Sequence, residues 1–207
     1  VRKCSGSGDC LPPTTFSWSD SPNQVASANS RADGQLNSNA FCAGSGGRWS
    51  WSDFNGDGML DATCVDASGA QYALVSDGSY LKTPNNQASG LLTSVKWCTG
   101  SQDISLWPDF NGDQLADSAC ITADGSISVL KSDGKYLSTV NTQATGLVRS
   151  QWCPASSCRA MVGNFDNDGR ADFLCSCDSG TQMVMVSDGK SVSTPNGNAN
   201  GTVLTGW

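Results

Sequence analysis

The feature that most constrains the fold of this 207-residue chain is an internal repeat with a period of 55 to 56 residues. A five-residue acidic segment begins at Asp53, Asp109 and Asn164, and a Ser-Asp-Gly triplet starts 23 residues after each of these positions. Repeat units of this kind bury their hydrophobic faces by stacking on their neighbours. The spacing defines an N-terminal segment and three repeats: 1–41, 42–97, 98–152 and 153–207.

Each unit carries the patterns of strands and turns and none of useful length with a helical period. In the second unit, short alternating or apolar runs are typical of partly buried strands, at 104–107, 118–122, 126–130 and 146–152. Four short strands per unit of this length are typical of the blades of a β-propeller. We therefore expect an all-β, β-propeller-like array of four-stranded blades. A linear β-solenoid or a stack of hairpins is the alternative.

The composition removes most familiar catalytic sites. All 19 acidic residues are aspartate, and the chain contains no histidine. Histidine-based triads, histidine-ligated zinc and glutamate acid/base pairs are therefore excluded, and we expect no enzyme and no catalytic residues. The formal net charge of -7 argues against a nucleic-acid or anionic-membrane partner, and no apolar run is long enough to span a membrane.

The acidic segments predict three Ca²⁺ sites, since oxygen donors recur at positions 1, 3, 5 and 9 of each loop, with a backbone carbonyl at position 7. The candidate ligands are Asp53, Asn55, Asp57, Met59 and Asp61; Asp109, Asn111, Asp113, Leu115 and Asp117; and Asn164, Asp166, Asp168, Arg170 and Asp172. Turns without an ion are the alternative. Position 6 is glycine in the first and third loops (Gly58 and Gly169) and Gln114 in the second. Either Gln114 adopts a strained backbone conformation, or the second loop has a different shape.

The loop segments resemble the FG-GAP/VCBS repeats of integrin α-subunit-type β-propellers. The resemblance covers 42–207 and rests on the Asp-Phe-Asn-Gly-Asp-Gly-x-x-Asp pattern that begins at Asp53. It implies four-stranded blades with Ca²⁺ held between the first two strands of each blade, in proteins that serve in adhesion, as lectins or as accessory domains of secreted enzymes. Gln114 and Asn164 depart from the pattern, and an integrin-type propeller has seven blades where this chain has three units.

Ten cysteines indicate an oxidising, extracellular compartment and a set of disulfides. In every unit one cysteine lies 11 residues before the first loop position and another lies 11 residues after it. A hairpin folded about the loop brings these positions together. The predicted pairs are Cys42–Cys64, Cys98–Cys120 and Cys153–Cys175, with Cys158–Cys177 as a second rung in the third unit and Cys4–Cys10 near the N-terminus.

Five of the seven tryptophans follow the repeat, and we assign them to packing in the blade core in preference to sugar stacking. These are Trp51, Trp97, Trp107, Trp152 and Trp207. Trp18 and Trp49 fall outside the register and are candidates for surface contacts.

Together these features predict a secreted, calcium-stabilised, disulfide-linked structural or adhesive repeat protein. The chain starts at Val1 and reads as a mature secreted form or an internal fragment, and Asn200 lies in a glycosylation sequon. The segment 1–41 is interpreted as a partial blade or a strand-donating arm, and open ends suggest assembly with other copies into an oligomer or an extracellular filament. The alternatives are a lectin that binds glycans and a non-catalytic accessory domain of a secreted hydrolase.

Overall fold

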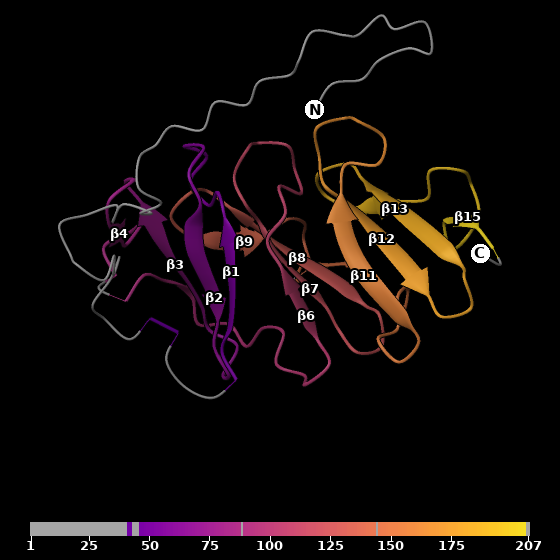
Figure 1. Ribbon diagram of the computed structural model, residues 1–207, viewed down its shortest axis with the longest axis horizontal. Coiled ribbons are helices and arrows are strands. Elements are labelled where there is room, and N and C mark those ends of the chain that lie inside the picture. Colours follow the sequence, from indigo (N-terminus) through magenta and orange to yellow (C-terminus); the bar gives the residue numbers. More distant parts are fainter. Residues whose placement is uncertain (1–40, 43–45, 88, 144, 206–207) are drawn as a thin grey trace, which may run out of the picture.

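The computed structural model describes residues 41–42, 46–87, 89–143 and 145–205, and within these ranges every regular element is a β-strand. The strands form three antiparallel sheets that follow one another in chain order (Figure 1). The first sheet contains β1 (Arg48–Ser52), β2 (Asp61–Val65), β3 (Gln71–Ser76), β4 (Leu81–Lys82) and β5 (Leu91–Thr93). The second contains β6 (Ile104–Leu106), β7 (Ser118–Ile121), β8 (Ile127–Ser132), β9 (Leu137–Thr139) and β10 (Leu147–Arg149). The third contains β11 (Cys158–Gly163), β12 (Asp172–Cys177), β13 (Gln182–Ser187), β14 (Val192–Ser193) and β15 (Thr202–Leu204).

Each sheet is a meander of three strands followed by a fourth position that two short strands share. In the first sheet, β4 pairs with the end of β3 and β5 pairs with its beginning. The second and third sheets repeat this arrangement on β8 and β13. The prediction of an all-β fold with three repeated sheets is confirmed, and the fourth strand of each unit is interrupted. The described residues contain no helix that is long and apolar enough to cross a membrane.

A glycine allows the second half of the fourth strand to approach the third strand. Gly90 has a φ of 73°, and a Cβ atom there would lie 2.2 Å from the carbonyl oxygen of Ala73. At the equivalent Gly146 and Gly201, a Cβ atom would lie 2.2 and 2.0 Å from a carbonyl oxygen of β8 and β13. Any side chain at these positions would push the two strands apart.

The hydrophobic core lies between successive sheets. The cluster between the first and second sheets includes Phe54, Val65, Ala73, Trp107 and Leu130. The cluster between the second and third sheets includes Phe110, Ile121, Val129, Phe173 and Met185. Each sheet therefore stabilises the next through face-to-face packing, as expected for stacked repeats. The three described sheets form a row, and they do not close into a ring.

Four predicted disulfides are confirmed. Cys42–Cys64, Cys98–Cys120 and Cys153–Cys175 each join positions 22 residues apart, and Cys158–Cys177 links opposite residues of β11 and β12. Closing a loop of this length stabilises the fold by about 3 kcal/mol in the chain-entropy treatment. The predicted Cys4–Cys10 pair lies outside the described residues.

The tryptophans divide between core and surface. Trp97, Trp107 and Trp152 are buried, which confirms their assignment to the core. Trp51 is 48% exposed, so the core assignment is wrong for this residue. Its equivalent Trp107 is buried because Phe54 of the preceding unit lies against it, with ring centroids 6.3 Å apart. Trp18 and Trp207 lie outside the described residues.

Candidate calcium-binding loops

The three acidic loops join the first two strands of their sheets. They run from β1 to β2, from β6 to β7 and from β11 to β12. The side chains at positions 3 and 5 of the first two loops reach solvent, whereas position 9 begins or directly precedes the second strand and is buried. This places the candidate ligands where the resemblance to calcium-binding blades implied, between the first and second strand.

The first loop folds around the carboxylate of Asp53. Its Oδ1 accepts hydrogen bonds from the amides of Gly56 (2.8 Å) and Asp57 (3.1 Å), and its Oδ2 accepts one from Gly58 (2.8 Å). Asn55 Oδ1 accepts a further bond from the Asp57 amide (3.1 Å), and the Asp57 Oδ1 accepts one from Met59 (2.8 Å). The tight turn therefore holds oxygen atoms from positions 1, 3 and 5 close together.

The second loop repeats this geometry. Asp109 accepts hydrogen bonds from the amides of Gly112 (2.7 Å), Asp113 (3.1 Å) and Gln114 (2.9 Å). Asn111 Nδ2 donates to Asp113 Oδ2 at 2.8 Å, as Asn55 donates to Asp57 in the first loop at 2.9 Å. Gln114 has a φ of 71°, so it adopts the left-handed backbone that Gly58 adopts in the first loop, and the loop keeps its path.

The third loop differs in the contacts of its first and seventh positions. Asn164 Oδ1 accepts a hydrogen bond from the Asp168 amide (3.1 Å). The guanidinium of Arg170 forms an ion pair with the carboxylate of Asp168 and donates from Nε to Ser187 O (2.9 Å). The prediction used only the backbone carbonyl of Arg170, and it did not foresee that the side chain would pair with a candidate ligand. A cation in this loop would compete with that guanidinium.

Position 9 is a buried aspartate in all three loops. Asp61, Asp117 and Asp172 have no exposed surface, and each accepts two backbone hydrogen bonds, one from the loop and one from the third strand. For Asp117 the donors are Phe110 N (3.0 Å) and Ser132 N (2.7 Å). The aspartate therefore fastens the loop to the third strand, a role that the sequence reasoning missed. The signal was the fixed interval between each loop and its Ser-Asp-Gly triplet.

Burial makes these carboxylates unfavourable as isolated charges. Burial raises the pKa of Asp117 to about 7, with a smaller rise from the nearby Asp113 and Asp109 carboxylates, although its two backbone hydrogen bonds oppose the shift. Burial likewise raises the pKa of Asp61. The donor set fits Ca²⁺, since each loop offers carboxylate, amide and carbonyl oxygen, and a cation would stabilise the ionised form of these buried groups.

Adjacent loops are joined by backbone hydrogen bonds. The amide of Ala116 in the second loop donates to Asp53 O in the first (2.9 Å), and the amide of Ala171 in the third donates to Asp109 O in the second (2.7 Å). The donor follows position 7 of its loop and the acceptor is position 1 of the preceding loop. The backbones of the three candidate sites are therefore hydrogen-bonded, each to the next, along the row of sheets.

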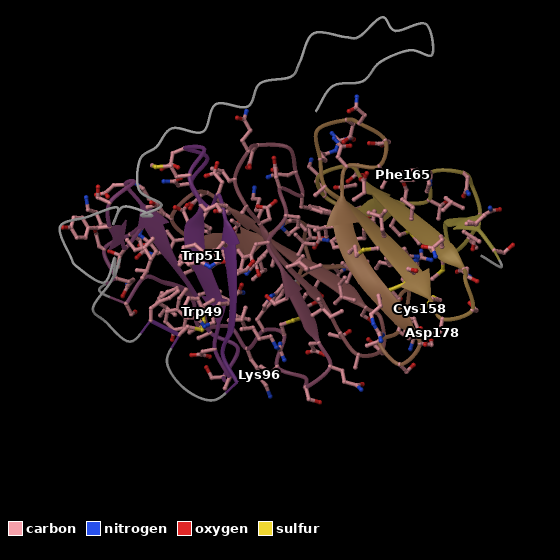
Figure 2. All side chains as sticks on the ribbon, viewed as in Figure 1. Trp49, Trp51, Lys96, Cys158, Phe165 and Asp178 are labelled. Carbon is pink, nitrogen blue, oxygen red and sulfur yellow. A yellow bond between two sulfur atoms is a disulfide. The ribbon has the colours of Figure 1, made fainter. Side chains whose placement is uncertain are left out.

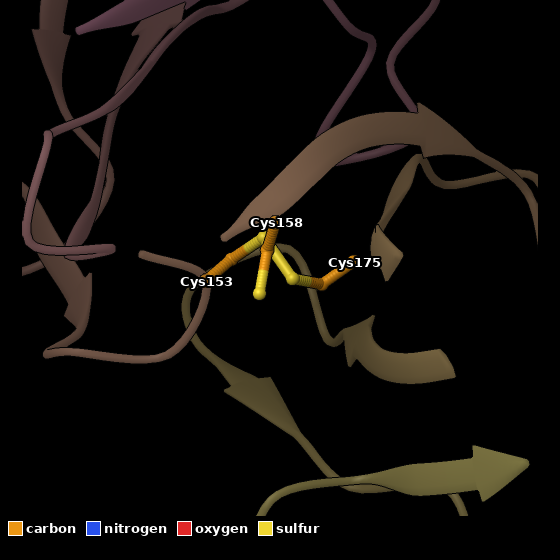
Figure 3. A group of neighbouring side chains, drawn as sticks. All are labelled: Cys153, Cys158 and Cys175. Carbon is orange, nitrogen blue, oxygen red and sulfur yellow. A yellow bond between two sulfur atoms is a disulfide. The ribbon is translucent and has the colours of Figure 1, made fainter. Parts of the chain in front are cut away.

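Two other groups of side chains have the spacing of metal ligands but are not available as such. The sulfur atoms of Cys153, Cys158 and Cys175 lie close together (Figure 3), and a second group contains Cys98, Asp103 and Cys120. Every cysteine in both groups is part of a disulfide, so none can supply a thiolate. Each of these disulfides lies within a single repeat unit.

No protein-family model matches the chain, and no curated protein matches it. Among solved structures, the chain is similar to an Agrocybe aegerita lectin whose structure was determined to explain specific recognition of non-reducing terminal N-acetylglucosamine. The TM-score is 0.52 at 14% sequence identity, over 71% of this chain and 37% of the lectin chain. The chain thus spans well under half the length of that protein. At this identity the likeness is evidence about the all-β fold alone.

Proposed function

We propose that this chain is a calcium-stabilised, disulfide-linked extracellular structural or adhesive repeat module without catalytic activity. The observation that carries the proposal is an oxygen-rich loop that occurs three times, each time with a fully buried aspartate at its ninth position. Four disulfides support an extracellular location. The absence of histidine and glutamate from the sequence supports a non-catalytic role.

The charge balance favours the same function. Nine of the 19 aspartates belong to the three loops, and three Ca²⁺ ions would change the formal net charge from -7 to about -1. The ions would thus remove most of the repulsion among carboxylates that the fold holds close together. We infer that calcium stabilises the folded units and keeps them stacked, since the loops are hydrogen-bonded to one another.

Isothermal titration of the metal-free protein with Ca²⁺ tests this proposal. We expect three calcium sites. Asp113→Ala should remove one of them, because it deletes a carboxylate ligand from the second loop. The matched control is Asp178→Ala, at an exposed aspartate that directly follows β12, at the opposite end of that strand from the third loop (Figure 2). Absence of calcium binding, or loss of the same site in both variants, would contradict the proposal.

Glycan binding is the second candidate, favoured by the likeness to a lectin and by two exposed tyrosines. Tyr80 and Tyr136 occupy equivalent turns after β3 and β8, and aromatic rings of this kind can stack on sugar faces. A glycan array in calcium that includes terminal N-acetylglucosamine tests this function. We expect Tyr80→Ala and Tyr136→Ala to weaken any binding, and an array without specific signals would exclude it.

A further inference from the structure

The two junctions between successive sheets share a buried phenylalanine from the preceding loop and a hydrogen bond between the loops. Phe54, at position 2 of the first loop, is fully buried and makes an edge contact with Trp107. Phe110 takes the same position in the second loop, is also fully buried, and packs against Phe173 of the third sheet with ring centroids 6.1 Å apart. A backbone hydrogen bond between the loops accompanies each contact. The buried phenylalanine and the loop-to-loop hydrogen bond therefore recur at both junctions, but the ring that the phenylalanine contacts differs. Trp107 corresponds to Val162 in the third unit, and Phe173 corresponds to Ser118 in the second.

On the third sheet, the residues equivalent to the Phe110 side of this interface are exposed to solvent. Phe165 occupies the position of Phe110 in the repeat, yet 48% of its surface is exposed. Met161 of β11 occupies the position of Leu106 in β6, which packs into the core between the second and third sheets, yet Met161 is 51% exposed. The two positions that pack against the next sheet in the second unit are thus apolar and exposed in the third unit.

On the first sheet, the residue equivalent to the Trp107 side of the interface is exposed to solvent. Trp51 is the equivalent of Trp107, the residue that receives Phe54 of the preceding unit. Trp51 is 48% exposed, whereas Trp107 is 8% exposed. Trp49, on the same strand, is also exposed. Figure 2 labels Trp51 on the first sheet and Phe165 on the third, with the second sheet between them.

We propose that the exposed face of the third sheet docks onto the exposed face of the first sheet in a second copy of this chain, with Phe165 of one copy against Trp51 of the other. The occupant is a second copy because one chain carries, exposed, both halves of the Phe54–Trp107 contact that it forms internally between its first two units. The contact rests on the proposed structural function and names its partner and its surfaces. It joins two different faces, so it continues into a ring or an open filament.

Sedimentation velocity of the 207-residue protein in calcium tests the docking. The end variants are Phe165→Ala and Trp51→Ala, with Phe165→Gln as a second variant at the same end. The control is Leu147→Ala, which removes an exposed apolar side chain from β10 of the middle sheet. We expect the unchanged protein and the control to assemble with increasing concentration, and each end variant to associate at least tenfold more weakly.

An equimolar mixture of Phe165→Ala and Trp51→Ala gives the sharpest result. The mixture retains one intact Phe165 face and one intact Trp51 face, so we expect it to form dimers and nothing larger. A monomeric unchanged protein overturns the proposal and favours residues 1–40 of the same chain as the cover of Trp51. End variants that assemble normally, or a mixture that stays monomeric, also overturn it. Calcium titration of the same samples separates this outcome from the proposed function, because a protein that binds calcium without assembling contradicts the docking alone.

Discussion

Position 6 of the acidic loops shows how backbone geometry and side-chain space act separately on one residue. Gly58, Gln114 and Gly169 all have a positive φ, of 83°, 71° and 91°. A Cβ atom at Gly58 or Gly169 would meet no other atom within 4 Å. A side chain therefore fits at this position, and the cost of Gln114 is confined to its left-handed backbone.

Replacing Gln114 with glycine is expected to stabilise the second unit. Glycine relieves backbone strain of about 1–2 kcal/mol, and its greater freedom in the unfolded chain offsets part of that gain. Gln114→Gly should raise the free energy of unfolding by about 0.5–1 kcal/mol and the melting temperature by about 2 °C in a chain of this length. The control is Gln87→Gly, an exposed loop position outside the positive-φ residues, which should gain nothing. Equal effects of the two substitutions would show that strain at Gln114 is not the cause.

At the scale of elements, the repeat in the sequence predicted those features that depend on short local patterns recurring at the same position in every unit. The unit spacing, the strands on either side of each loop and the four described disulfides all follow from such signals. The recurrence of one cysteine pair in every unit gave the correct pairing, but the hairpin register is not its cause. Cys120 lies opposite Ser105 in the β6–β7 register, and Cys98 reaches Cys120 from the segment that precedes β6. Calcium ligation by the loops remains a prediction.

Features that depend on a neighbouring unit could not be read from one unit. Trp51 and Trp107 have the same local sequence setting, and only the sheet that lies against Trp107 buries it. The divided fourth strand depends on how closely Gly90 approaches Ala73 across the sheet. The pairing of Arg170 with Asp168 depends on rotamers of an exposed loop, for which the sequence carries no periodic signal.

The third loop is expected to bind calcium more weakly than the first two. Its position-7 residue places a guanidinium beside Asp168, where the first two loops have Met59 and Leu115. Arg170→Leu removes that competing charge, so the weakest calcium site should tighten by about threefold, in line with the free energy of an exposed ion pair. Isothermal titration at low salt measures this change.

The control for this change is Lys96→Leu, which removes the same charge from an exposed position in the first unit, away from the third loop (Figure 2). We expect Lys96→Leu to leave the weakest site unchanged. If both substitutions tighten calcium binding equally, the effect comes from the net charge of the protein and not from the pair with Asp168.

At the scale of the whole molecule, we expect the buried Asp117 to couple folding to both pH and calcium. The pKa of Asp117 is raised from 3.8 to about 7, so the folded metal-free protein holds this proton over a range in which the unfolded chain has lost it. Its contribution to stability is complete below pH 3.8 and disappears as the pH rises through about 7. A Ca²⁺ ion at this loop would bind the ionised carboxylate and compete with the proton, so calcium-dependent stability would increase with pH.

The metal-free protein is therefore expected to lose stability as the pH rises from 4 to 8, by up to about 4 kcal/mol from Asp117 alone. In millimolar calcium the melting temperature should instead stay level or rise over the same range. Thermal unfolding of protein stripped on a chelating resin, measured with and without added Ca²⁺, checks the reversal. Asp117→Asn, which carries no titrating proton, should flatten the metal-free curve and lose one calcium site. A metal-free melting temperature that rises with pH, or an unchanged slope in Asp117→Asn, would show that this buried carboxylate does not couple folding to the ion.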